Sequence, residues 1–202
     1  MTKLVYVVRK DSGITRMFQQ RKGYQITNEV MLADIIVWGG GADVNPEMYG
    51  QKPIEETHSS PDTDVLYQKV WEQSFAIADP KIARVGICLG GQWLNCKNKG
   101  SMWQHVNNHG RSHEIVDLTT GEKIMVTSTH HQMMRPHESG EILAVAHEAT
   151  LYKDQHKTVN EAQEYDTEVV YYAETNSLCF QPHPEYSSKH TEEYFFKLLE
   201  KI

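Results

Sequence analysis

Residues 86–92 read Gly-Ile-Cys-Leu-Gly-Gly-Gln, and this stretch decides the fold because its cysteine follows the apolar run Ala83–Ile87 and precedes a predicted helix. A reactive side chain framed by glycines at a strand-to-helix turn is the arrangement of a nucleophile elbow. The turn strains the central residue, and glycines let the neighbouring chain approach closely. The sequence therefore predicts that Cys88 is a nucleophile at a helix N-terminus, where free backbone N–H groups favour a thiolate and can hold an oxyanion. The alternative is a small buried apolar cysteine.

The composition is that of an ordinary globular protein. The 202 residues suffice for one domain, 39% of them are hydrophobic, and the net charge is −7 with scattered Lys and Arg. This pattern argues against nucleic acid and anionic membrane as partners. Three widely spaced cysteines fit a reducing compartment, and we expect Cys96 and Cys179 to be core residues. Because no apolar run is long enough for a signal peptide or a membrane span, we expect a soluble cytoplasmic protein.

The first half of the chain alternates strands and helices, which is typical of a parallel α/β sheet with functional loops at the strands' carboxyl ends. Strands are predicted at residues 4–8, 35–38 and 83–87. The second strand runs into glycines at residues 39–41 and a polar loop at residues 42–59. Ser60 as N-cap and Pro61 at the first position predict a helix. We expect its apolar face to consist of Val65, Leu66, Val70, Trp71 and Phe75.

The second half has a different character. Shorter strands are predicted at residues 114–118, 123–128, 142–146 and 169–173, with turns between them. A last strand at residues 177–180 precedes Gln-Pro-His-Pro-Glu, and an amphipathic helix from about Thr191 ends the chain. We therefore predict a single α/β domain over residues 1–202, a three-layer sandwich. Its central sheet is mostly parallel, with antiparallel strands added in the second half.

A catalytic thiolate needs a base, and the base needs a group that orients it. One of the 11 histidines stands out as the base. His183 follows a strand and lies two residues before Glu185. On an extended backbone these side chains point to the same side, so the carboxylate can accept a hydrogen bond from the ring. Pro182 and Pro184 keep this segment from becoming helical. Taken locally, the sequence equally fits a solvated turn.

Together, the cysteine elbow and Phe-Gln-Pro-His-Pro-Glu at residues 180–185 resemble the class I glutamine amidotransferase family. The resemblance covers nearly the whole chain and is closest to the γ-glutamyl hydrolase (peptidase C26) branch, which includes the γ-glutamyl-γ-aminobutyrate hydrolases. Three further segments carry it: Trp-Gly-Gly-Gly-Ala-Asp-Val-Asn-Pro at residues 38–46, Gln-Trp-Leu-Asn at residues 92–95, and Thr-Ser-Thr-His-His-Gln at residues 127–132.

This resemblance implies a catalytic triad in which Cys88 is the nucleophile, His183 the base and acid, and Glu185 the orienting carboxylate. The implied reaction cleaves the γ-glutamyl amide bond of a small molecule through a thioester and needs no cofactor. The remaining residues implied are the oxyanion-hole donors Gly40 and Leu89 and the substrate-binding residues Gln92, His131 and Gln132.

Two forms of this activity stay open. In one, glutamine is the substrate and ammonia passes to a synthetase or ligase on a separate chain, because a single domain has no room for the acceptor site. In the other, the protein alone hydrolyses a γ-glutamyl conjugate. A silent regulatory relative and a thiol-based stress protein are further alternatives. The first usually loses the cysteine, histidine or glutamate, and the second typically lacks a His-Pro-Glu ending.

Trp38 departs from the family pattern, since this branch usually has a proline at the position. A bulky aromatic there could wall the pocket or cover the sheet edge, and we favour the sheet edge.

Histidines at a four-residue spacing raise the question of a metal site. His105, His109 and His113 recur in this way, but the asparagines and the glycine between them argue against one shared helical face. No cysteine or carboxylate in the pattern completes a zinc set with them. We therefore expect no metal site, and we expect His113 to pack near the active loop.

Overall fold

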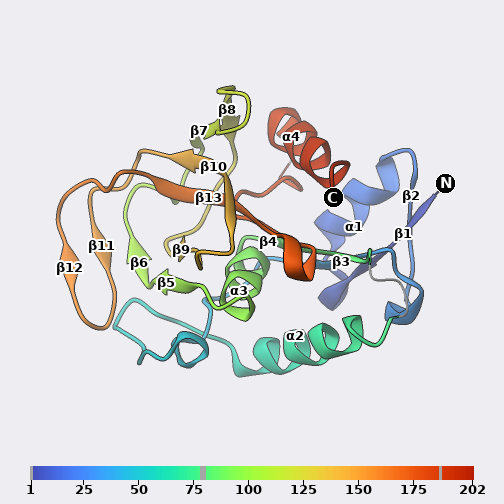
Figure 1. The fold of residues 1–202 in the computed structure, drawn as a ribbon, viewed down its shortest axis with the longest axis horizontal. Helices are drawn as coiled ribbons and strands as arrows, with labels where there is room; N and C mark the ends of the chain where they lie inside the picture. Colours follow the sequence, from blue (N-terminus) through green and yellow to red (C-terminus); the bar gives the residue numbers. More distant parts are fainter. Residues whose placement is uncertain (1, 78–80, 187) are drawn as a thin grey trace.

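The computed structural model describes residues 2–77, 81–186 and 188–202. In this part of the chain nine strands form one sheet (Figure 1). Neighbouring strands are parallel in its first half and antiparallel in its second half, which confirms the predicted mixed sheet. In spatial order they are β2 (Tyr24–Ile26), β1 (Lys3–Val7), β3 (Ile35–Trp38), β4 (Ala83–Ile87), β14 (Ser177–Phe180), β13 (Asp166–Tyr172), β10 (Glu141–Ala146), β7 (His113–Asp117) and β8 (Lys123–Val126). The parallel pairs run from β2 to β14.

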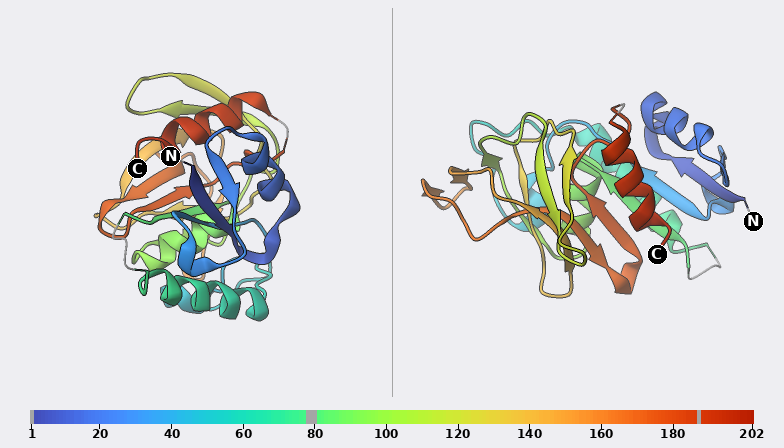
Figure 2. Two further views of the ribbon diagram at one scale, coloured as in Figure 1. Left: turned by 90° about the vertical axis from the view of Figure 1, so that its right-hand side faces the viewer. Right: turned by 90° about the horizontal axis from the view of Figure 1, so that it is seen from above.

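Helices cover both faces of this sheet, which gives the predicted three layers (Figure 2). One face packs against α1 (Ser12–Gln20) and α4 (Lys189–Leu199), and the other against α2 (Pro61–Ser74) and α3 (Leu89–Lys97). Successive side chains of β3 point to opposite faces of the sheet, so the strand contributes to the hydrophobic core on each face. Ile35 packs in the core with α1 and α4, and Ile36 packs in the core with α2 and α3. Among the helices of the described residues, none is long and apolar enough to cross a lipid bilayer.

Short elements complete the described structure. Two small sheets lie at the end of the molecule opposite the N-terminus (Figure 1). Their strands have only two or three residues each, too few for a periodic pattern, and were not predicted. They are β5 (Ser101–Trp103) with β9 (Met133–Arg135), and β6 (His105–Val106) with β11 (Tyr152–Lys153) and β12 (Thr158–Val159). The 3-10 helices are η1 (Val8–Lys10), η2 (Val30–Leu32), η3 (Pro46–Tyr49) and η4 (Ala173–Thr175).

Helix α2 begins at Pro61 with Ser60 as N-cap, as predicted, but its predicted apolar face is partly wrong. Val65, Leu66 and Phe75 are 71%, 36% and 54% exposed. The helix instead turns the side of Tyr67, Val70 and Trp71 inward, where the Tyr67 hydroxyl donates to the Gly39 carbonyl at 2.8 Å. The buried residues are Thr63, Tyr67, Val70, Trp71 and Ser74.

Trp38 lies inside the core, so the expectation that it covers the sheet edge is wrong. Strand β3 lies between β1 and β4, and the indole is fully buried on the side of α2 and α3. Its Nε1 donates to the Tyr67 carbonyl at 3.3 Å, and its ring meets that of Trp71 edge-on with centroids 6.4 Å apart. The side chain therefore fixes the position of α2 and of the glycine loop that follows β3.

The N-terminal helix α1 was not predicted, although its signals are local. Asp11 caps it: the Oδ1 atom accepts hydrogen bonds from the backbone N–H groups of Gly13 at 2.9 Å and Ile14 at 3.0 Å. Ile14, Met17 and Phe18, spaced three and four residues apart, form its buried face.

Close packing of the elbow predicts a large effect for Gly90→Ala. A Cβ at Gly90 would lie 2.1 Å from the Trp38 carbonyl oxygen, and because this neighbour is backbone, the Cβ fits only if helix α3 moves away from β3. We expect the substitution to lower the free energy of unfolding by about 3 kcal/mol or more, measured by urea denaturation. Gly110→Ala is the matched control, because a Cβ there meets nothing within 4 Å. Equal stability of the two variants would contradict this packing.

Candidate active site

A cavity of about 520 Å³ opens at the carboxyl ends of the central parallel strands. The loops after β3 and β4 and the segment after β14 line it, which is where ligands bind in sheets of this kind. A fourth wall comes from residues 127–132 between β8 and β9, here called the pocket loop, of which residues 129–132 line the cavity.

Cys88 is the turn between β4 and α3 and has φ 52° and ψ −114°. This positive φ is strained for a residue with a side chain and persists only where the surroundings enforce it. The Cys88 N–H donates to the Phe180 carbonyl at 2.9 Å, and a Cβ on Gly86 would lie 2.3 Å from the Gly90 backbone. Close packing of strand against helix thus holds the thiol at the cavity wall.

His183 and Glu185 form a hydrogen-bonded pair beside Cys88, in the same cavity. The His183 Nδ1 atom lies 2.7 Å from Glu185 Oε1 and donates to it. Gly40 packs against both His183 and Cys88, since a Cβ there would lie 3.1 Å from His183 Cε1 and 3.7 Å from Cys88 Cβ. The structure therefore brings together the predicted cysteine, histidine and glutamate and the predicted glycine of the first loop.

The electrostatics of His183 favour its charged form. Burial lowers the pKa of the imidazole, but the neighbouring Cys88 sulfur and the Glu185 carboxylate outweigh burial and raise it to about 10. An imidazolium beside the sulfur stabilises a thiolate and can later donate its proton.

Of the other predicted site residues, Gln92 and Gln132 line this cavity, whereas Leu89 follows Cys88 in the chain but is not part of the cavity wall. Leu89 is the first residue of α3, where the backbone N–H has no acceptor within the helix. The buried Gln92 amide donates to Gln181 Oε1 at 3.1 Å and to the Gln132 carbonyl at 3.4 Å. The Gln132 side chain accepts from Val44 N–H at 3.2 Å. Both glutamines thus line the cavity and also tie its walls together.

His131 lines the cavity from the pocket loop and pairs with an acidic residue. Its Nε2 atom lies 3.0 Å from Asp43 Oδ1, and its Nδ1 atom lies 3.3 Å from His105 Nδ1. The hydrogen bond to Asp43 raises the pKa of His131 and outweighs burial, whereas burial lowers the pKa of His105 and the charge of His131 adds to this. The pair therefore concentrates positive charge on His131, at the cavity.

Sequence reasoning missed several residues that position His183. Thr129 Oγ1 lies 3.0 Å from His183 Nε2, and the Tyr186 ring stacks on the imidazole at 4.2 Å. Thr127 holds the His183 backbone, because its carbonyl accepts from His183 N–H at 2.8 Å and its hydroxyl donates to the His183 carbonyl at 2.7 Å. The two threonines lie in a motif that the sequence already singled out. Asp11, the N-cap residue of α1, also lines the cavity, but it lies in no motif that the sequence singled out.

The remaining cysteines and histidines give one confirmation and one correction. Cys96 and Cys179 are buried, as predicted, and burial raises the pKa of both thiols. The expectation that no carboxylate completes a histidine cluster is wrong, because Glu168 on β13 contacts His109 and His113. His113 does pack near the pocket loop, with its ring 6.2 Å from that of His130.

The fold is that of the class I glutamine amidotransferases. The chain belongs to the Peptidase C26 family, whose model matches residues 2–185. Membership of this family supports enzymatic activity.

Individual relatives are distant. The carbamoyl phosphate synthase small chain of Campylobacter jejuni is 29% identical over 135 residues, which cover 66% of this chain and only 32% of that protein. The glutamine amidotransferase-like protein YvdE of Lactococcus lactis is 24% identical over 200 residues, 88% of this chain and 78% of YvdE. Among solved structures, a GMP synthase subunit from Thermoplasma acidophilum has a TM-score of 0.65 at 13% identity, covering 100% of this chain and 99% of that one. PurLQS from Thermotoga maritima has the same TM-score at 16% identity and the same coverage.

Proposed function

We propose that this protein is a cysteine hydrolase that cleaves a γ-glutamyl amide bond, in glutamine or a γ-glutamyl conjugate, through a thioester on Cys88. One observation carries the proposal: a cysteine in a strained elbow shares a cavity with an imidazole that Glu185 orients at 2.7 Å. The matching family model and relatives named as a carbamoyl phosphate synthase small chain and a glutamine amidotransferase-like protein support the same chemistry.

In the first half of the proposed reaction, the Cys88 thiolate attacks the δ-carbonyl carbon of the γ-glutamyl group. The backbone N–H groups of Gly40 and Leu89 stabilise the tetrahedral oxyanion, and a donor in this role is typically worth about 3–4 kcal/mol. His183 gives its proton to the departing nitrogen. The C–N bond then breaks, the amine or ammonia leaves, and a γ-glutamyl thioester remains.

The second half reverses these roles. Neutral His183 takes a proton from water, the resulting hydroxide attacks the thioester, and the thiolate leaves from the second tetrahedral intermediate. Glutamate is released, and the imidazolium and thiolate are restored. Throughout, Glu185 holds the ring and stabilises its positive charge.

The fate of the released nitrogen distinguishes two forms of this function. As an amidotransferase subunit, the protein would pass ammonia to a synthetase or ligase partner, as expected for a relative of a synthase small chain. A free-standing γ-glutamyl-amine hydrolase is the second candidate. The cavity of about 520 Å³ has room for a leaving group larger than ammonia.

Glutamate release by the purified protein tests the function, with glutamine and a panel of γ-glutamyl amines as substrates and Cys88→Ala as the control. Release from conjugates but not from glutamine identifies a free-standing hydrolase. Release from glutamine that rises when a synthetase partner is added identifies an amidotransferase subunit. Failure to release glutamate from any substrate, together with no labelling of Cys88 by a thiol-reactive glutamine analogue, would refute the proposal.

The raised pKa of His183 predicts a wide alkaline range of activity. The imidazolium keeps its proton through neutral pH and loses it as pH rises towards about 10, so the alkaline fall of kcat/KM should come only as pH approaches that value. In Glu185→Gln the Cys88 sulfur still raises this pKa, but the contribution of the carboxylate is lost while burial, which lowers the pKa, remains. We expect the alkaline midpoint of the pH–rate profile to fall by at least about one pH unit. Exposed Glu174→Gln is the matched control, and an unchanged midpoint in Glu185→Gln would contradict the pairing.

A further inference from the structure

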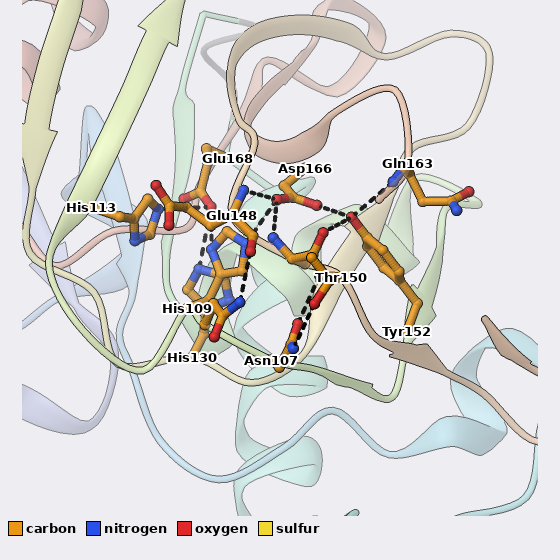
Figure 3. Close-up of polar contacts among 12 residues, drawn as sticks. Asn107, His109, His113, His130, Glu148, Thr150, Tyr152, Gln163, Asp166 and Glu168 are labelled. Carbon is orange, nitrogen blue, oxygen red and sulfur yellow. Dashed lines mark hydrogen bonds and ion pairs between the residues drawn. The ribbon is translucent and has the colours of Figure 1, made fainter. Parts of the chain in front are cut away.

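Three histidines and one glutamate converge in the antiparallel half of the molecule (Figure 3). His109 lies between β6 and β7, His113 begins β7, His130 belongs to the pocket loop, and Glu168 lies on β13. All four are at most 4% exposed, and one ligand atom from each lies within 4.8 Å of the others. None of the proposed catalytic steps uses this cluster.

The distances from the carboxylate to the three inward-facing nitrogens match those of a tetrahedral coordination shell, and all four ligand atoms lie within 4.8 Å of one another. Glu168 Oε1 lies 3.1 Å from His109 Nδ1, 3.2 Å from His113 Nε2 and 3.4 Å from His130 Nε2. Four ligands at about 2.0–2.1 Å from a central zinc ion, at tetrahedral angles, lie about 3.3–3.4 Å from one another. The three distances from Glu168 Oε1 are therefore close to the ligand–ligand distance of a tetrahedral zinc site.

The outward-facing nitrogen of each ring is held by an acceptor. A ring that donates its outward N–H is left with a lone pair on the inward nitrogen, which is how metal-binding histidines are oriented. Two of the acceptors are backbone carbonyls, which can only accept. The contacts are His109 Nε2 to Asp166 Oδ2 at 3.1 Å, His113 Nδ1 to the Arg111 carbonyl at 3.0 Å, and His130 Nδ1 to the Gln132 carbonyl at 2.8 Å.

The hydrogen bonds inside the cluster are incomplete. Among the described residues, His109 Nδ1, His130 Nε2 and Glu168 Oε2 are buried and have no hydrogen-bond partner. His130 Nε2 faces a carboxylate oxygen, and with Nδ1 donating to a carbonyl it presents a lone pair to another acceptor. Burying such groups without a hydrogen-bond partner costs free energy of folding. A cation between the nitrogen lone pair and the carboxylate oxygen removes the repulsion between these two acceptors.

The charge balance points the same way. Glu168 and Asp166 are two buried carboxylates, and the ion pairs they form among the described residues are with histidines. The cluster therefore attracts positive charge, and three neutral imidazoles with one divalent cation would neutralise both carboxylates.

We propose that His109, His113, His130 and Glu168 bind a zinc ion in a closed tetrahedral site. Imidazole nitrogen and carboxylate oxygen are both zinc ligands, and a site with four protein ligands and no open position is structural. The ion would join the pocket loop to β7 and β13, and so hold the cavity wall that contacts His183 through Thr129. Asp166 would act through His109 as an orienting partner, itself fixed by the N–H groups of Glu148 and Ala149.

Metal analysis of the full chain, purified without a polyhistidine tag and dialysed against metal-free buffer, tests the site. We expect about one zinc ion per chain in the wild type and in His147→Gln, an exposed histidine outside the cluster. His113→Gln and Glu168→Gln should each retain less than about a tenth of that amount.

Reconstitution keeps the test decisive even if these variants fail to fold. Chelator-treated wild type should bind Co²⁺ with the intense visible absorption of a tetrahedral site, and added Zn²⁺ should abolish that absorption. Zinc should also raise the midpoint of thermal unfolding by at least about 5 °C. A wild type that purifies without stoichiometric metal, gives no such Co²⁺ spectrum and shows no thermal shift with Zn²⁺ would overturn the proposal. The four side chains would then form a hydrogen-bonded network without a metal ion. Glutamate release is not part of this readout, so the site and the proposed function fail independently.

Discussion

Cys88→Ala should abolish glutamate release, lowering kcat by at least about 10⁴-fold, as expected when a covalent nucleophile is removed. Without the sulfur no thioester forms, and the remaining donors can at most polarise the substrate for attack by water. Alanine keeps the Cβ of the elbow and therefore the same backbone strain at φ 52°. The folded state should be retained, which circular dichroism and the urea midpoint check.

The matched control is Cys96→Ala, which removes another buried thiol, from the helix that follows the elbow. Because Cys96 packs in the core and is not part of the cavity wall, this variant should keep most of its kcat. Wild-type turnover in Cys88→Ala would show that the elbow cysteine is not the nucleophile.

His183→Ala is expected to have the second largest effect, a loss of about 10²–10⁴-fold in kcat, the usual contribution of a general acid–base. The variant loses both the positive charge that stabilises the thiolate and the proton donor for the leaving nitrogen. Added imidazole should restore part of the rate, because truncation leaves space next to Tyr186, whose ring stacks on His183.

His190→Ala is the control for this variant, since His190 is exposed in the first turn of α4. It should match the wild type in rate and in pH dependence. A loss of less than about tenfold in His183→Ala would mean that another group acts as acid and base.

The elements that the sequence predicted well are those whose pattern and boundaries are local. Ile35–Trp38 and Ser177–Phe180 are runs of buried residues, and both strands have the predicted bounds. The orientation of α2 could not be predicted in this way, because its exposed Val65 and Phe75 carry the same apolar signal as its buried Trp71. Which of them faces the sheet is decided by tertiary packing, in which Trp71 joins Trp38 and Trp93 and Tyr67 contacts the glycine loop.

The same distinction holds for the site. Cys88, His183 and Glu185 are recognisable because each lies in a short segment with its own chemistry. Thr129 reaches His183 across 54 residues, and Glu168 reaches His113 across 55. Both contacts join segments that are neither close in the chain nor on adjacent strands, since β10 lies between β13 and β7 and three strands lie between β14 and β8, so no local spacing encodes them. A carboxylate on a buried strand is the signal that could have directed attention to Glu168.

The central claim is a covalent γ-glutamyl intermediate on Cys88, and acid quenching followed by mass spectrometry tests it most directly. Wild-type protein would be mixed with a γ-glutamyl amide, quenched in acid within the first turnover, and digested for mass analysis. We expect a γ-glutamyl group on the peptide that contains Cys88, and its absence from Cys88→Ala. Full glutamate release with no adduct on Cys88, or with an adduct on Cys96 or Cys179 instead, would contradict the account.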